Sequence, residues 1–145
     1  MGELEFVSSF RDLLVYKKSR MLSREIFGLT KKFPKEEAYS LIDQIRRSSR
    51  SVGAQIAEAW AKRRYEKHFI NKLTDADGEQ HETQHWIGIS LDCGYISLEQ
   101  AKDLVEKCEE IGRMLGGMMN KADSFCNPQS LSVKEEQAAY LSGGH

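Results

Sequence analysis

Apolar residues recur every three or four positions along this chain in four long stretches, and polar residues fill the positions between them. This spacing places the apolar side chains on one face of a helix. It predicts helices over residues 10–32, 35–62, 66–93 and 98–123, with no strand pattern between them. The most regular apolar face belongs to the last stretch and consists of Ala101, Leu104, Cys108, Ile111, Leu115, Met118 and Ala122.

The residues between these stretches are of the kinds that begin and end helices. Pro34 suits the first position of the second helix, and Gly94 suits a left-handed residue after the third. Ser97 and Gln100 match a capping box for the fourth helix. Gly53 costs the second helix about 1 kcal/mol relative to alanine, so we interpret it as a point where a neighbouring helix approaches closely.

The periodic pattern stops after Phe125. We therefore expect a single domain over residues 1–125, followed by a mobile C-terminal tail over residues 126–145. Long helices with short connections pack as bundles. The predicted fold class is all-α, an antiparallel up-down-up-down four-helix bundle.

Composition limits the kinds of partner. The 145 residues carry a net charge of −1, so any basic binding site must be a local patch. No apolar stretch approaches the roughly 20 residues that span a bilayer, and the N-terminus lacks a secretory-signal pattern. We expect no membrane partner. The three cysteines have no pairing motif, which favours free thiols in a reducing cytoplasm.

Five short motifs follow one another in a fixed order. They are Phe10, Phe33-Pro34, Gln44-Ile45-Arg46-Arg47, Gln55-Ile56-Ala57-Glu58-Ala59 and Gly94-Tyr95-Ile96. In this order and spacing, the chain resembles a family of four-helix-bundle proteins named for open reading frames inside intervening sequences of bacterial 23S ribosomal RNA genes. The resemblance covers residues 10–123. Gln55 and Ala59 depart from the asparagine and glycine usual in the family, and the second departure bears on where the second helix ends.

The resemblance also implies a homo-oligomer, because similar proteins form five-fold rings. The sequence supports association independently, since the late part of the third helix carries apolar residues on more than one face. A bundle helix needs only one such face. The candidate oligomer contacts are Trp86, Ile89 and Cys93. The alternative is that the third helix is central and covered on several sides within one subunit.

Basic residues cluster at two places on the predicted second helix. The candidate nucleic-acid contacts are Arg46, Arg47, Arg50, Lys62, Arg63 and Arg64. Repeated around a ring, each cluster would form a basic collar able to contact phosphates. Basic residues at a helix end also complement the helix dipole. The alternative for the first cluster is ion pairing with an acidic stripe on the third helix, made of Asp75, Glu79 and Glu82.

The segment from His81 to His85 matches the pattern H-E-x-x-H. Two histidines at this spacing share a helical face and can bind zinc, with Glu82 as general base. Such metalloproteases, however, place the motif in a cleft beside a sheet, and the sequence predicts no strand. Glu82 and His85 also have the spacing of di-iron bundles, but the second motif that those sites need is absent. We expect no catalytic residue and no cofactor, with metal binding by His81, Glu82 and His85 as the alternative.

These observations predict a non-enzymatic, cytoplasmic assembly or adaptor protein that contacts RNA, DNA or a nucleoprotein partner through its basic clusters. The first alternative is a scaffold that binds another protein, and no nucleic acid, through the apolar surface of the third helix. The second is a metal-binding protein or metal-dependent hydrolase that uses the HETQH segment. Each of the three hypotheses assigns the function to a different surface.

Overall fold

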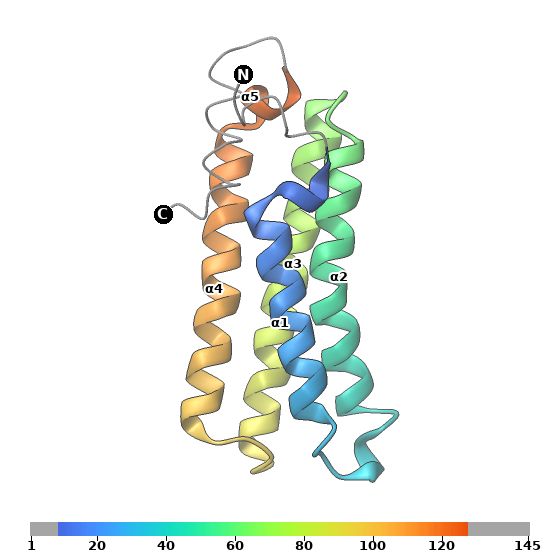
Figure 1. Ribbon diagram of the computed structural model, residues 1–145, viewed down its shortest axis with the longest axis vertical. Coiled ribbons are helices and arrows are strands. Elements are labelled where there is room, and N and C mark those ends of the chain that lie inside the picture. The colour runs from blue at the N-terminus through green and yellow to red at the C-terminus, as the bar shows by residue number, and fades with distance from the viewer. Residues whose placement is uncertain (1–8, 128–145) are drawn as a thin grey trace.

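The computed structural model describes residues 9–127 and is helical over most of that range. The long helices are α1 (Leu14–Thr30), α2 (Leu41–Ala61), α3 (Glu66–Asp92) and α4 (Leu98–Asn120). The shorter ones are η2 (Phe10–Asp12), η3 (Lys35–Glu37) and α5 (Ala122–Cys126). The long helices lie side by side along the long axis of the molecule (Figure 1), and residues 9–127 contain no strand. The prediction of an all-helical fold is confirmed.

The first two long helices begin later than predicted because local contacts interrupt the helical pattern. The Ser9 hydroxyl accepts a hydrogen bond from the Arg11 amide at 3.1 Å and starts η2, after which Leu13 is extended at φ −70° and ψ 132°. The predicted start of the second helix at residue 35 is also wrong. Pro34 has an extended ψ of 142° and leads into η3, and the α-helical geometry of α2 begins only after Ser40.

The ends of the third and fourth predicted helices agree more closely with the structure. Gly94 follows α3 with a φ of +77°, the left-handed conformation expected of it. The Ser97 hydroxyl accepts from the Gln100 amide at 3.1 Å, and the Gln100 side chain accepts from the Ser97 amide at 2.8 Å. This completes the predicted capping box. The predicted fourth helix divides into α4 and the short α5. The tail expected over residues 126–145 starts too early, because Cys126 still belongs to α5, and its residues after Asn127 lie outside the described part of the chain.

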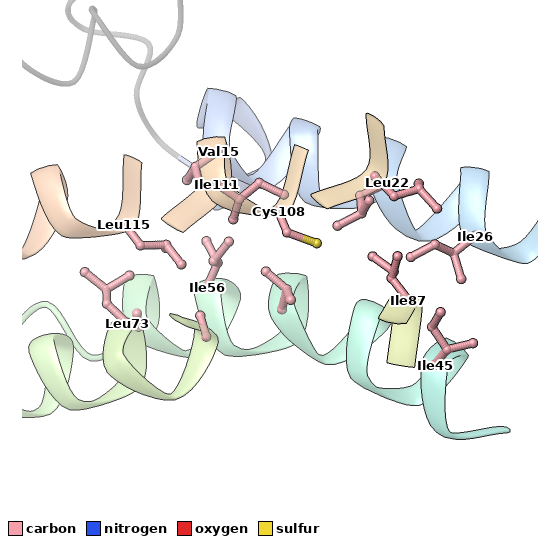
Figure 2. Close-up of a cluster of buried hydrophobic side chains, with 14 of the residues drawn as sticks. Val15, Leu22, Ile26, Ile45, Ile56, Leu73, Ile87, Cys108, Ile111 and Leu115 are labelled. Atoms are coloured by element: carbon pink, nitrogen blue, oxygen red, sulfur yellow. The ribbon is translucent and has the colours of Figure 1, made fainter. Parts of the chain in front are cut away.

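All four long helices contribute to one apolar core. Figure 2 shows side chains from each helix meeting between the ribbons, including Val15, Leu22, Ile26, Ile45, Ile56, Leu73, Ile87, Cys108, Ile111 and Leu115. Phe125 of α5 covers one end of this core, where its ring stacks on that of Phe69 with centroids 6.0 Å apart. Burial of this kind is the main stabilising contribution to the fold.

Small residues bring α2 close to its neighbours. A Cβ atom on Gly53 would lie 3.0 Å from the Ser19 hydroxyl and 3.5 Å from the Tyr16 ring, both on α1. The interpretation of Gly53 as a point of close approach is therefore confirmed. On the side of α2 that faces α3, the hydroxyls of Ser48 and Thr83 share a buried hydrogen bond of 2.9 Å.

Two of the sequence motifs meet at one end of the molecule. The Phe33 ring, before the turn into η3, lies 5.1 Å from the Tyr95 ring, which follows α3. The Tyr95 hydroxyl donates a 2.8 Å hydrogen bond to the Glu37 carboxylate. These two contacts connect the turn between α1 and α2 to the turn between α3 and α4.

Within residues 9–127, no helix has the length and apolar character of a membrane span.

Candidate nucleic-acid interface

The three arginines of the first basic cluster line one open hollow on the outer side of α2. This α2 hollow has a volume of about 510 Å³ and is lined by Ala38, Ile42, Asp43, Arg46, Arg47, Arg50, Ser51 and Ala54. Arg46 and Arg50 are four residues apart and share a helical face, whereas Arg47 lies on the side of the hollow nearer α3. Asp43 is the single carboxylate among the lining residues.

Arg46 is held in place by α1. Its Nε donates a 2.8 Å hydrogen bond to the Thr30 hydroxyl, and its Nη2 lies 3.4 Å from the Phe27 carbonyl oxygen. The guanidinium also lies 4.5 Å from the centroid of the Phe27 ring, and that of Arg50 lies 5.5 Å from it. Because α1 ends at Thr30, the positive charge of Arg46 also interacts favourably with the negative end of the α1 dipole. Phe27 therefore positions two arginines of the cluster.

Arg47 is the member of the cluster that forms an ion pair. Its Nη2 lies 3.2 Å from a Glu82 oxygen on α3 and 2.9 Å from the Gln44 side-chain oxygen. The same Glu82 oxygen accepts a hydrogen bond of 3.0 Å from the Trp86 indole. The expected pairing between the arginines and the acidic stripe is therefore found at Glu82, whereas Asp75 lies 3.9 Å from Lys72. One Glu79 oxygen is buried without a hydrogen-bond partner in the described part of the chain.

A second hollow continues the basic surface between α1 and α2. This α1–α2 hollow has a volume of about 330 Å³ and is lined by Phe10, Tyr16, Ser19, Arg20, Ser23, Arg50, Gly53, Ala54 and Ala57. It shares Arg50 and Ala54 with the α2 hollow, so the two form one continuous surface. We call this surface the arginine groove and define it by Arg20, Arg46, Arg47 and Arg50.

The sequence pattern did not single out Arg20, because it lies among scattered basic residues of the first helix. Its place in the groove depends on the close approach of α1 to Gly53. Within residues 9–127, no carboxylate lies within 4.0 Å of Arg20, Arg46 or Arg50. Among the described residues, the groove therefore has an ion pair only at Arg47, and Asp43 is the one carboxylate that lines its two hollows.

The second basic cluster lies at the other end of α2. At 1.5 Å per residue, Lys62 is about 25 Å from Arg46 along the helix axis, so the structure keeps the two clusters apart. Arg63 folds back onto α2, with its Nε 2.9 Å from the Trp60 carbonyl oxygen and its guanidinium 3.6 Å from the indole centroid. The contact with Trp60 partly buries the Arg63 guanidinium, and this burial lowers its pKa from the ordinary value. Lys62 and the exposed Arg64 complete the cluster.

The histidines of the HETQH segment do not converge on a common site. The His81 Nδ1 lies 2.9 Å from the Asp77 carbonyl oxygen, while the His85 ring packs edge-on against Trp86 with centroids 4.6 Å apart. Glu82 is engaged by Arg47 and Trp86 instead. Within the described residues, no three His, Cys, Asp or Glu side chains form a group that could hold a metal ion.

The candidate oligomer contacts differ in exposure. Trp86 and Ile89 are partly buried against the core, and Cys93 is exposed. A separate apolar hollow of about 330 Å³ lies between α3 and α4. Its apolar lining consists of Ile87, Gly88, Leu91, Leu98, Ala101 and Val105. Leu98 is 57 % exposed, and its spacing of seven residues from Val105 is the sequence signal for this surface.

Residues 11–117 match the family described as 23S rRNA-intervening sequence protein. A crystal structure from Bacteroides thetaiotaomicron, of a protein described as having unknown function and belonging to the S23 ribosomal protein family, is similar to this chain. The two share 32 % sequence identity, and the similarity covers 73 % of this chain and 95 % of that one with a TM-score of 0.67. No curated protein shows significant similarity to the chain.

Proposed function

The chain belongs to the 23S rRNA-intervening sequence protein family, and from this premise we propose that it is a non-enzymatic assembly or adaptor protein. In this proposal the bundle is antiparallel, with up-down-up-down topology, and assembles into a five-fold ring in the cytoplasm. Each subunit contacts the phosphate backbone of RNA or DNA through its arginine groove. The phosphates are bound without regard to base sequence, because guanidinium contacts to phosphate carry no sequence information.

The observation that supports this proposal is the uncompensated charge of the arginine groove. Arg20, Arg46 and Arg50 have no carboxylate partner among residues 9–127. Arg46 and Arg50 are also ordered against Phe27. An arginine that is held in place loses less conformational entropy when it binds. A planar guanidinium matches the geometry of a phosphate and can bind it with two hydrogen bonds.

The end cluster has a secondary part in this proposal. Lys62 and Arg64 would extend the phosphate path by about 18 Å along α2 beyond Arg50, at 1.5 Å per residue. Arg63 contributes less, because its guanidinium lies against the Trp60 indole, where burial disfavours the charged form and lowers the pKa. Replacing Lys62 and Arg64 with glutamine should therefore weaken binding less than replacing two arginines of the groove.

The first prediction concerns oligomeric mass and RNA binding. Light scattering at low salt, with and without a mixed RNA pool, should show a ring-sized species that gains mass with RNA and releases it at higher salt. The double variant Arg20→Gln/Arg50→Gln should weaken binding about tenfold or more. It should also reduce the slope of log K against log salt by about 1.4 to 1.8, since two phosphate contacts are lost.

The matched control is Lys102→Gln/Arg113→Gln, which removes the same charge from exposed positions on α4. This variant should bind almost as the unaltered protein does. Equal loss of binding in both double variants would mean that net charge alone matters, and would remove the arginine groove from the proposal.

The apolar hollow between α3 and α4 favours a second candidate function, a protein-binding scaffold. Apolar hollows rimmed by polar residues are typical of protein interaction sites, and this one is lined mainly by aliphatic side chains. A ring-sized species that ignores RNA in the same light-scattering experiment would support the scaffold.

A further inference from the structure

We propose that the α1–α2 hollow seats one unpaired nucleobase, so that the arginine groove prefers single-stranded nucleic acid to a duplex. This inference rests on the proposed function and adds the class of strand that the same surface recognises. It stands on three features of the hollow, namely its aromatic wall, its small-residue floor and its two arginines.

The aromatic wall comes from the start of the described chain. The Tyr16 ring lies beside Gly53, and the Phe10 ring meets it edge-on with centroids 4.9 Å apart. Both rings line the hollow and both are only partly buried. A Cβ atom on Gly53 would lie 3.5 Å from the Tyr16 ring, so the missing side chain leaves space beside the ring. A partly exposed aromatic ring is the kind of surface on which bases stack.

The floor of the hollow is made of small side chains. Gly53, Ala54 and Ala57 of α2 face Ser19 and Ser23 of α1 across it. The resulting volume of about 330 Å³ is at the lower end of the range for small-molecule pockets, about 300 to 1,000 Å³. It therefore suits a single base rather than a stacked pair.

The charges around the hollow match a nucleotide's phosphate. Arg20 and Arg50 are the charged residues of the lining, and neither has a carboxylate within 4.0 Å among residues 9–127. Arg20 lies over the Tyr16 ring, with its guanidinium 5.9 Å from the ring centroid and its Nη1 3.5 Å from the Tyr16 hydroxyl. A base resting on Tyr16 would thus have arginines within reach of its own phosphates.

A duplex cannot use this arrangement. Its bases are stacked on both faces, so an aromatic side chain can reach a base face only where a base is unpaired. The phosphates of a duplex can still contact Arg46 and Arg47 in the α2 hollow. Single strands should therefore gain an interaction at the α1–α2 hollow that duplexes lack.

The test compares a short labelled RNA strand with the same strand annealed to its complement, by fluorescence anisotropy at equal salt. The full chain should bind the single strand at least fivefold more tightly. Ala57→Leu, which fills the α1–α2 hollow from a partly buried position that does not line the α2 hollow, should remove that preference and leave duplex binding unchanged. Ala61→Leu makes the same change at an exposed position of α2 outside the hollow and should preserve the preference.

A photo-crosslink gives a second, independent readout. A strand carrying 5-bromouridine should crosslink to the peptide that contains Phe10 or Tyr16. Equal affinity for single strand and duplex, no effect of Ala57→Leu, or crosslinks confined to other peptides would overturn the base site. If a nucleoside monophosphate prevents the crosslink as effectively as an unlabelled competitor strand does, the hollow is a site for free nucleotides instead.

The two proposals fail in different ways. Salt-sensitive binding of single strand and duplex with equal affinity removes only the base site and leaves backbone contact in place. Binding of neither, at low salt and with an intact oligomer, removes the proposed function together with the base site.

Discussion

At the scale of single residues, the contact between Tyr95 and Glu37 joins two turns that are far apart in the sequence. One Glu37 oxygen accepts from Tyr95, and the other accepts from the Ser40 hydroxyl at 2.7 Å and the Leu41 amide at 3.4 Å. Glu37 therefore serves the first residue of α2 much as a capping side chain would. The hydrogen bonds from Ser40 and then Tyr95 lower the pKa of Glu37 from its ordinary 4.5, and the bond to Glu37 raises the pKa of Tyr95 to about 12.

These shifts in pKa predict how the contact depends on pH. The lowered pKa of Glu37 means that its contribution to stability is present above pH 4.5 and is lost as pH falls through the folded-state pKa. The raised pKa of Tyr95 means that its contribution is present below pH 10.0 and is lost as pH rises through about 12. Subtracting the phenolate absorbance titration of Tyr95→Phe from that of the unaltered chain should leave one group that titrates near pH 12.

Glu37→Gln is the control for this titration. It removes the carboxylate that stabilises the neutral phenol, so the same difference measured in the Glu37→Gln background should move back toward pH 10.0. A Tyr95 that titrates near pH 10.0 in the unaltered chain would contradict the contact.

At the scale of elements, the fit between α3 and α4 depends on Gly112. A Cβ atom at this position would lie 2.7 Å from the Gln80 amide nitrogen and 3.2 Å from an Asp77 oxygen. Gln80 is only 2 % exposed, and its amide is already bonded to Asp77 at 2.9 Å and to Gln84 at 2.8 Å. The missing side chain of Gly112 therefore makes room for a buried polar network that has little freedom to move.

Two glycine substitutions on α4 should have opposite effects. Gly112→Ala should lower the free energy of unfolding by about 1–3 kcal/mol, because the new methyl group overpacks the site. Gly116→Ala has nothing within 4 Å of the added Cβ and should raise it by about 0.4–1 kcal/mol through helix propensity and reduced unfolded-state entropy. Urea titration of both variants measures the difference. Equal stabilisation by both would show that Gly112 is not closely packed.

The hydrophobic period and the capping residues were enough to predict α3 and α4, because Gly94, Ser97 and Gln100 act on the backbone next to them. The starts of α1 and α2 were not predictable in this way, since side-chain contacts of Ser9 and Glu37 with nearby backbone amides replace the helical pattern there. For the candidate site, the sequence identified Arg46, Arg47 and Arg50. It missed Arg20, whose place in the groove depends on the packing of α1 against α2.

At the scale of the whole molecule, charged side chains bridge α1 and α4 at the surface. Lys107 lies 2.7 Å from Glu25 and 2.9 Å from Asp103, and Lys18 lies 3.3 Å from Glu110. The hydrogen bonds to Glu25 and then Asp103 raise the pKa of Lys107 from its ordinary value, which reflects their preference for its charged form. All of these side chains are partly open to solvent, so salt should screen the pairs.

A double-mutant cycle with Glu25→Gln and Lys107→Met should therefore give a small coupling energy. We expect about 0.2–1 kcal/mol at low salt, decreasing in concentrated salt. The cycle is measured from urea unfolding of the four proteins. A coupling that is larger and unaffected by salt would show that the bridge is better shielded from water than its exposure indicates.

The arrangement of Arg47, Glu82 and Trp86 has a practical consequence. One carboxylate oxygen binds both the guanidinium and the indole N–H, so an anion that draws Arg47 away would change the surroundings of the indole. Trp60 lies at the other end of α2 beneath Arg63, so Trp60→Phe would leave Trp86 as the single tryptophan. In that background the intrinsic fluorescence of the chain becomes an optical reporter of occupancy at the α2 hollow, without an attached dye.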